Sequence, residues 1–365
     1  MSNNRPEIGD LLYLLTIPNI GPGRIRKLFQ VFGSRAEIIK APAQKLVCVE
    51  GIDYKLAARI KSGGDTAKAE EQLKLIEKHG VKYVTVWDEN YPRLLKRISD
   101  PPVVLFYKGK LKAEQKSALA VVGTRTPSNY GKMVTTDIVR QLCERGITIV
   151  SGMARGIDAV AHHTAIQSGA ETLAVLGCGL DRCYPPENSK LFREIPEHGA
   201  LISEYFVGVG PDATNFPKRN RIISGLTQGA LVVEAGDRSG ALITAFYALN
   251  YNREVFAIPG NITSPKSNGA NSLIKQGAKL VQTADDIFEE IREFAGADTI
   301  SERPVPENLK EFEKKILSCL SKEPKHIDRL VTELQDSPAT ILAGLLSLEL
   351  MGLVQQLAGK MFVRM

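Results

Sequence analysis

The chain has 365 residues, too many for one ordinary hydrophobic core, so its length predicts two or three domains. The formal net charge of +6 is compatible with an anionic partner and equally with simple solubility, so charge alone does not identify a nucleic-acid-binding protein. No segment reaches the roughly 18 uninterrupted apolar residues of a membrane span, and residues 1–6 lack the apolar core of a signal peptide, which predicts a soluble, cytoplasmic protein without a membrane partner.

Residues 1–78 carry apolar side chains at helical spacing and predict a SAM-like helix-hairpin-helix domain. The first unit turns at the Gly-rich segment 18–23, and a weaker second unit turns at 49–52 without a Gly-x-Gly pair. Such hairpins can bind a phosphate through backbone N–H groups, and they also serve purely as packing modules. Both interpretations stay open for the first unit. Its secondary nucleic-acid candidates are Arg24, Arg26 and Lys27.

Residues 79–296 change to short apolar runs that alternate with helical stretches. The predicted strands are 82–86, 103–107, 118–122, 148–150, 172–176, 200–203, 230–233, 254–258 and 279–281. Runs of this kind are buried on both faces, so they predict an α/β domain with a mostly parallel, doubly wound sheet. Ligands of such sheets bind beyond the carboxyl ends of the strands.

Gly-containing loops follow several of these strands and open helices that could bind phosphate. In Gly123-Thr124-Arg125 the arginine replaces the second glycine of a G-x-G-x-x-G dinucleotide fingerprint, so no dinucleotide is expected there. The glycines of the loop 151–158 could equally serve only a tight strand-to-helix turn. The candidate nucleic-acid-binding residues in these loops are Gly123, Arg125, Ser151, Gly152, Arg155, Gly156, Ser239, Gly240 and Thr244.

Residues 215–221 form a compact basic run with one aromatic ring. Cations neutralise phosphates, and a ring offers a face for base stacking worth about 1 to 3 kcal/mol per base, whatever the base. The alternative is a solvated basic turn, because short basic runs have low specificity. The candidates in this run are Asn215, Phe216, Lys218, Arg219, Asn220 and Arg221.

Residues 297–306, with two prolines and alternating charges, predict a linker. Three helical patterns and the stretch 353–364 follow in residues 307–365 and predict a winged helix. Residues 337–354 contain no Lys or Arg, so the helix that would read DNA has little to offer a phosphate or a base edge. We therefore expect a partner-binding or dimer-supporting domain and not a transcription factor.

The five cysteines contain no C-x-x-C pair, and Cys178 and Cys183 lack the second ligand pair that a zinc site needs. We expect reduced cysteines, no metal site and no cofactor. His162 and His163 follow Asp158 on one helical stretch without a nucleophile beside them. We therefore expect packed or solvated histidines and no catalytic group.

The motifs 123–125, 151–158, 216–226 and 239–245 resemble those of the DNA-processing protein A (DprA/Smf) family, over residues 80–285. The resemblance implies an extended Rossmann-like core that binds single-stranded DNA, protects incoming DNA during natural transformation and loads the RecA recombinase onto it. It also implies a homodimer formed through that core. Asn220 would shape its loop, and the residues expected to contact DNA are Arg125, Phe216, Lys218, Arg219 and Arg221.

The main alternative is an enzyme. Related Rossmann-like folds include nucleotide phosphoribohydrolases, and in this chain Glu204 or Glu234 would then be the acid or the nucleophile at the same sheet edge. The sequence contains neither the P-G-G-x-G-T-x-x-E loop of that family nor the G-x-x-x-x-G-K-[ST] loop of P-loop ATPases. We therefore expect a binding protein and not an enzyme.

Overall fold

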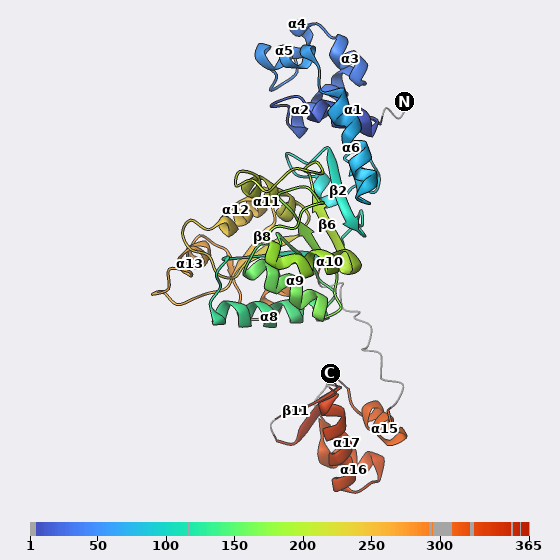
Figure 1. The fold of residues 1–365 in the computed structure, drawn as a ribbon. Coiled ribbons are helices and arrows are strands. Elements are labelled where there is room, and N and C mark those ends of the chain that lie inside the picture. The colour runs from blue at the N-terminus through green and yellow to red at the C-terminus, as the bar shows by residue number, and fades with distance from the viewer. Residues whose placement is uncertain are drawn as a thin grey trace. The chain divides into compact units, whose positions relative to one another are not determined.

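The computed structural model describes residues 5–115, 117–291, 294, 309–321, 325–351, 353–357 and 359–364. The chain divides into two compact units, residues 1–300 and 301–365 (Figure 1). The predicted linker at 297–306 lies outside the described residues. No helix in the described parts of the chain is long and apolar enough to cross a membrane.

The first unit begins with six helices, in the segment for which the sequence predicted a helical domain. They are α1 (Ile8–Leu15), α2 (Pro22–Phe32), α3 (Arg35–Lys40), α4 (Ala43–Val47), α5 (Tyr54–Ser62) and α6 (Thr66–Lys78). Pro22 lies at the start of α2, where its missing N–H costs no helical hydrogen bond. The Asp53 side chain accepts the Leu56 N–H and caps α5. Two helix-hairpin-helix units, α1 with α2 and α4 with α5, result.

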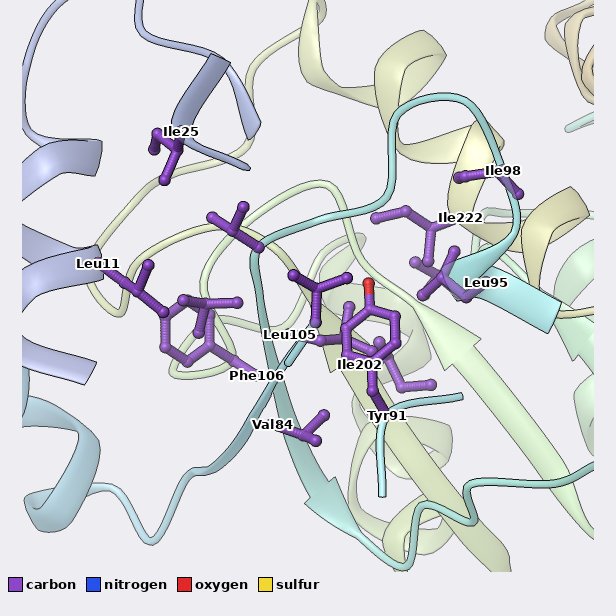
Figure 2. Packing of buried hydrophobic residues seen from close by; sticks show 14 of the residues in the cluster. Leu11, Ile25, Val84, Tyr91, Leu95, Ile98, Leu105, Phe106, Ile202 and Ile222 are labelled. Carbon is purple, nitrogen blue, oxygen red and sulfur yellow. The ribbon is translucent and has the colours of Figure 1, made fainter. Parts of the chain in front are cut away.

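These helices share one hydrophobic core with the sheet that follows. Leu11 of α1 belongs to the same buried cluster as Leu105 and Phe106 of the sheet (Figure 2). In addition, the Gln72 side-chain amide of α6 donates a buried 3.0 Å hydrogen bond to the Val207 carbonyl. The helical part is therefore packed onto the sheet within one unit.

A nine-stranded sheet in the order β1-β2-β6-β5-β4-β3-β7-β8-β9 forms the centre of the first unit. Its strands are β1 (Lys82–Thr85), β2 (Val104–Gly109), β3 (Ala118–Val122), β4 (Thr148–Ser151), β5 (Thr172–Val175), β6 (Gly199–Ser203), β7 (Gly229–Val232), β8 (Glu254–Ala257) and β9 (Lys279–Leu280). All nine predicted strands are present. The strands from β6 to β9 in this order pair in parallel, whereas β2 pairs antiparallel with β1 and β6.

Helices cover both faces of the sheet. They are α7 (Arg93–Lys96), α8 (Asn129–Glu144), α9 (Ile157–Gln167), the 3₁₀ turn η1 (Pro186–Asn188), α10 (Ser189–His198), α11 (Asn215–Gly225), α12 (Gly240–Asn250), α13 (Asn268–Lys275) and α14 (Asp285–Glu290). Val121 of β3 packs in one cluster with Ile138 of α8 and Ala161 of α9. The preceding Ala120 belongs to the other cluster, with Ile222 of α11, because successive side chains of a strand point to opposite faces.

The strand order reverses at β3, which pairs with β4 on one side and with β7 on the other. In doubly wound sheets the crevice outside the carboxyl ends of the strands at such a reversal is where ligands bind. The loops after β3, β4 and β7 meet at this edge. They are the Gly-containing loops that the sequence singled out.

The second unit is a winged helix, which confirms the prediction for the C-terminal part. Its elements are α15 (Glu311–Cys319), β10 (Lys325–His326), α16 (Ile327–Leu334), α17 (Pro338–Leu350), β11 (Val354–Leu357) and β12 (Met361–Arg364). The three strands form a sheet in the order β10-β12-β11. Ile341 and Leu345 of α17 are fully buried, whereas Leu342 and Leu346 are 44% and 58% exposed. The apolar character of this helix therefore exceeds what its own core buries.

Candidate nucleic-acid interface

A pocket of about 740 Å³ opens at the edge of the sheet where the strand order reverses. The loops after β3, β4 and β7 line it together with the start of α11 and with Tyr184. Of the predicted residues, those that line this pocket are Gly123, Arg125, Phe216, Arg219, Asn220, Ser239, Gly240 and Thr244. The other predicted residues of the sheet domain do not line the pocket; they are Ser151, Gly152, Arg155, Gly156, Asn215, Lys218 and Arg221.

The loop after β3 is held in place by backbone contacts. The Thr124 N–H donates to the Glu234 carbonyl at 2.7 Å, and the Thr124 carbonyl accepts the Ile157 N–H at 3.2 Å. Gly156 has φ +81°, and a Cβ on it would lie 2.3 Å from the Thr124 carbonyl oxygen. Only glycine allows this conformation and this approach, so Gly156 serves the turn into α9.

Two cations reach the pocket without an ion-pair partner among the described residues. Arg125, at the end of β3, is exposed, and its guanidinium carbon lies 5.7 Å from the centre of the Phe216 ring. Arg238, in the loop before α12, is also exposed and lines the same pocket. Their charges are therefore available to an anionic ligand. Arg155, by contrast, forms an exposed ion pair with Glu187.

An aromatic pair forms part of the pocket wall. The rings of Phe216 and Tyr184 stack with their centres 5.4 Å apart and an angle of 24° between their planes. Asn215, which precedes Phe216 at the start of α11, donates from its side-chain amide to the Gly177 carbonyl at 3.3 Å. Asn215 therefore anchors the first turn of α11 beside the loop after β5.

The structure corrects the expectation that Arg219 is free to contact DNA. Its side chain is only 5% exposed, and its guanidinium donates to the carbonyls of Val175 and Gly152, the latter at 2.9 Å. Asp158, buried behind Arg219, accepts the Gly152 N–H at 3.1 Å. Burial lowers the pKa of Arg219 and raises the pKa of Asp158, and the attraction between the two opposes both shifts. Arg219 therefore supports the pocket from inside.

The two other cations of the basic run differ in exposure: Arg221 is buried like Arg219, whereas Lys218 is exposed. The Arg221 guanidinium is buried and forms an ion pair with Glu204 and a longer contact, 3.7 Å, with Asp100. We therefore correct its predicted role from a DNA contact to a structural ion pair. Lys218 is exposed and has no ion-pair partner in the described parts of the chain, so its charge remains available to an anionic ligand.

Three further predicted residues also contribute to the framework. The Ser151 hydroxyl is fully buried and donates to the Val121 carbonyl at 2.6 Å. Gly152 is buried against the Arg219 guanidinium, where a Cβ would lie 2.4 Å from a guanidinium nitrogen. The Asn220 amide donates to the Gly240 carbonyl at 3.2 Å and so links α11 to α12, in agreement with its predicted shaping role. We correct Ser151 and Gly152 from DNA contacts to supports of the loop.

The secondary candidates of the N-terminal hairpins are mostly engaged. Arg24 donates to the Gly51 carbonyl at 2.6 Å and to the Asn19 carbonyl at 2.9 Å, and so ties the two hairpins together. Lys27 pairs with Glu50 at 2.8 Å. Arg26, which is half-buried, has no ion-pair partner among the described residues. None of the three lines the pocket at the sheet edge.

The two carboxylates of the enzyme alternative have structural partners. Glu204 is largely buried beside Arg221, with its side chain 13% exposed; burial raises the pKa of its carboxyl, and Arg221 opposes that shift. The Glu234 carboxylate accepts both the N–H and the hydroxyl of Ser128, the N-cap residue of α8. Neither carboxylate is among the residues that line the pocket.

His162 is a packed histidine. It is fully buried, and its Nδ1 lies 2.7 Å from the Thr172 hydroxyl, which itself donates to the Ile149 carbonyl. Because the single hydroxyl proton points to that carbonyl, Nδ1 carries the ring proton and donates. Burial, reinforced by the charge of Arg219, lowers the pKa of His162 to about 3. The ring is therefore neutral at physiological pH.

Sequence reasoning assigned no role to two residues of this site. Arg238 lies within a loop that the sequence identified. Its position as a cation in a Gly-rich strand-to-helix loop is a sequence feature that could have identified it. Tyr184 lies in a loop 32 positions before Phe216, and no local pattern indicates that their rings meet.

Comparisons with known proteins agree with this fold. The family model described as DNA recombination-mediator protein A matches residues 82–292, a DprA winged helix domain model matches 301–360, and a SAM-like helix-hairpin-helix tandem model matches 11–63. Protein Smf of Synechocystis sp. is 34% identical, with 95% of this chain and 96% of that protein aligned.

Two solved structures are similar to this chain. The X-ray structure of DNA processing protein A from Streptococcus pneumoniae has a TM-score of 0.68 at 34% identity, over 79% of this chain and 99% of that chain. A structure of DNA processing protein A from Helicobacter pylori, described for its single-stranded DNA binding mode, has a TM-score of 0.52 at 31% identity, over 57% and 95%. With a family model over more than half of its length and a relative aligned almost throughout, the chain belongs to the DNA recombination-mediator protein A (DprA/Smf) family.

Proposed function

We propose that this chain binds single-stranded DNA without sequence preference in the pocket beside β3 and β7. The observation that carries the proposal is the meeting, in one pocket, of two cations with a stacked pair of rings. The cations are Arg125 and Arg238, which have no ion-pair partner among the residues that the structure describes, and the rings are those of Phe216 and Tyr184. Cations bind phosphates and rings bind base faces, and neither group carries a sequence code. The similar protein from Helicobacter pylori, described as binding single-stranded DNA, supports the same ligand.

We further propose that the bound strand is incoming DNA, which the protein protects and onto which it loads RecA during natural transformation. Membership in the DprA/Smf family supports this step, as it supports a homodimer. The winged helix would hold a protein partner or support the dimer. Its helix α17 exposes Leu342 and Leu346, and the segment 337–354 has no Lys or Arg with which to hold a phosphate.

We also propose that the pocket binds its ligand without hydrolysing it. Glu204 and Glu234, the carboxylates that a phosphoribohydrolase would use, hold Arg221 and Ser128 and lie outside the pocket lining. A general acid or base must come within hydrogen-bond reach of the reacting atom. Asp158 does line the pocket, but it accepts backbone N–H groups and faces Arg219.

The test is a titration of the full chain with fluorescent oligonucleotides of equal length, single-stranded and double-stranded, at several salt concentrations. We expect a preference for single strands of any sequence. If Arg125, Arg238 and Lys218 each contact one phosphate, the logarithm of the affinity falls by about 2 per logarithmic unit of salt. A parallel incubation with nucleoside monophosphates, followed for release of the free base, serves as the activity control.

Binding that is weak and insensitive to salt, together with release of a base from a mononucleotide, would refute the proposal and assign the sheet edge to an enzyme. The RecA step has its own assay, filament formation by RecA on strands coated with a single-strand-binding protein. We expect this chain to accelerate it. The matched control is an Arg125→Met variant. We expect it to keep the fold, because the replaced side chain is exposed.

A further inference from the structure

Phe216 is the ring that the sequence indicates for base stacking, but in the structure other side chains already lie against this ring. Tyr184 stacks on it at 5.4 Å, and the Arg125 guanidinium lies 5.7 Å from its centre. Its edge packs on the loop after β5, where a Cβ on Gly177 would lie 2.8 Å from Phe216 Cδ1. The Phe216 ring is therefore packed against its neighbours, and an incoming base would have to displace one of them to stack on it.

Tyr184 presents the more accessible ring of the pair. Its side chain is 39% exposed although it stacks on Phe216 and lines the pocket. An aromatic side chain that is packed on one side and open on the other is the surface on which a nucleobase stacks. Phe216 then supports Tyr184 from behind.

The segment that carries Tyr184 is fixed in position. The Asn188 side-chain amide donates to the Met153 carbonyl at 2.9 Å and to the Ala154 carbonyl at 3.2 Å, in the loop after β4. The Asn188 N–H donates to the Pro185 carbonyl at 3.1 Å. Since the ring is held before a ligand arrives, little conformational entropy is lost on binding.

We propose that Tyr184 is the platform on which a nucleobase of the bound strand stacks, with Phe216 as its support and Arg125 as the nearest cation for the adjoining phosphate. This inference rests on the proposed binding of single-stranded DNA and names a residue and a contact for it. The contact uses the face of the base, so it forms with any of the bases. It cannot form on a strand that lacks its bases.

The experiment compares two variants of the full chain, Tyr184→Phe and Tyr184→Leu, on two probes. The first probe is an oligothymidylate. The second is a strand of the same length and charge in which every sugar lacks its base. On the first probe we expect Tyr184→Phe to bind like the unmodified chain and Tyr184→Leu to lose about 5- to 150-fold in affinity, the range of one base–ring stack. On the abasic probe we expect all three proteins to bind equally.

A strand with one 2-aminopurine gives a second readout, because stacking quenches this base. Placed at successive positions, it should be quenched at one of them by the unmodified chain and by Tyr184→Phe, and not by Tyr184→Leu. Unchanged oligothymidylate affinity in Tyr184→Leu would overturn the inference. An equal loss on both probes would also overturn it, because the ring would then act only by holding the pocket together. Failure of the unmodified chain to bind either probe would instead remove the proposed function itself.

Discussion

Replacement of Arg219 by methionine separates a buried structural arginine from a DNA contact. Its guanidinium donates to the carbonyls of Val175 and Gly152 and faces the buried Asp158. Methionine fills a similar volume but leaves those carbonyl acceptors without this donor and the buried Asp158 carboxylate without its cationic neighbour. Removing a buried charge that faces an opposite charge costs about 3 to 5 kcal/mol, and proton uptake by the Asp158 carboxyl keeps the loss from exceeding that range. We expect the free energy of unfolding of the first unit to fall by about that amount.

The assay is urea unfolding followed by tryptophan fluorescence. Trp87 is the single tryptophan of the sequence, and its ring meets that of Phe29 edge-on with 5.6 Å between centres. Its signal therefore reports the first unit separately from the winged helix. With a denaturant slope of about 3 kcal/mol/M, Arg219→Met should lower the urea midpoint by roughly 1 to 2 M.

The matched control is the neighbouring cation, Lys218→Met. Lys218 is exposed, so we expect its urea midpoint to stay within the equivalent of about 0.5 kcal/mol. Its affinity for single strands of any sequence should fall, with the salt slope reduced by about 0.7. The reasoning is refuted if Arg219→Met keeps the midpoint of the unmodified chain and lowers the salt slope as Lys218→Met does.

Three further changes test the pocket and its surroundings. Arg125→Met combined with Arg238→Met should leave the urea midpoint unchanged and reduce the salt slope of strand binding by about 1.4, and an unchanged slope would remove both from the phosphate path. Gly177→Ala should cost about 1 to 3 kcal/mol of unfolding free energy and weaken strand binding, because the new methyl displaces the Phe216 ring; unchanged values in both assays would contradict that packing. The pKa of His162 is about 3 in the folded protein, below its ordinary value of 6.5. As the pH drops from 6.5 toward 3, the unfolded chain therefore binds this proton and the folded chain does not, so the free energy of unfolding falls. His162→Gln should remove about 2 kcal/mol of the stability lost between pH 6.5 and pH 5, as measured by urea midpoints at both pH values; an equal pH dependence in both proteins would count against a neutral buried ring.

The sequence alone determined the sheet and its glycine-containing edge. Each strand is a short apolar run and each crossover a helical period, and these are local patterns that neighbouring residues encode. The nine strands follow from them, and so does the edge at which the ligand pocket lies, because the carboxyl ends of parallel strands share one edge. The winged helix followed from its element order in the same way.

The tertiary structure decided which cations of the basic run are exposed. Lys218 and Arg219 are neighbours, but successive side chains of a helix point about 100° apart, so α11 exposes one and buries the other. Nothing within the run specifies which of the two is buried. The choice depends on the carbonyls of Val175 and Gly152, which lie 44 and 67 positions away in the sequence.

The aromatic wall has the same origin. Tyr184 and Phe216 lie in different connections between strands. Their rings meet because the loop that follows β5 lies beside the start of α11. A lone tyrosine in a loop and a phenylalanine in a basic run predict two separate features. Composition and periodicity determine elements, because those depend on residues close in sequence. The pairing of side chains depends on how the elements pack, and here packing made a stacked pair and placed Arg125 and Arg238 in the same pocket, without an ion-pair partner in the described parts of the chain.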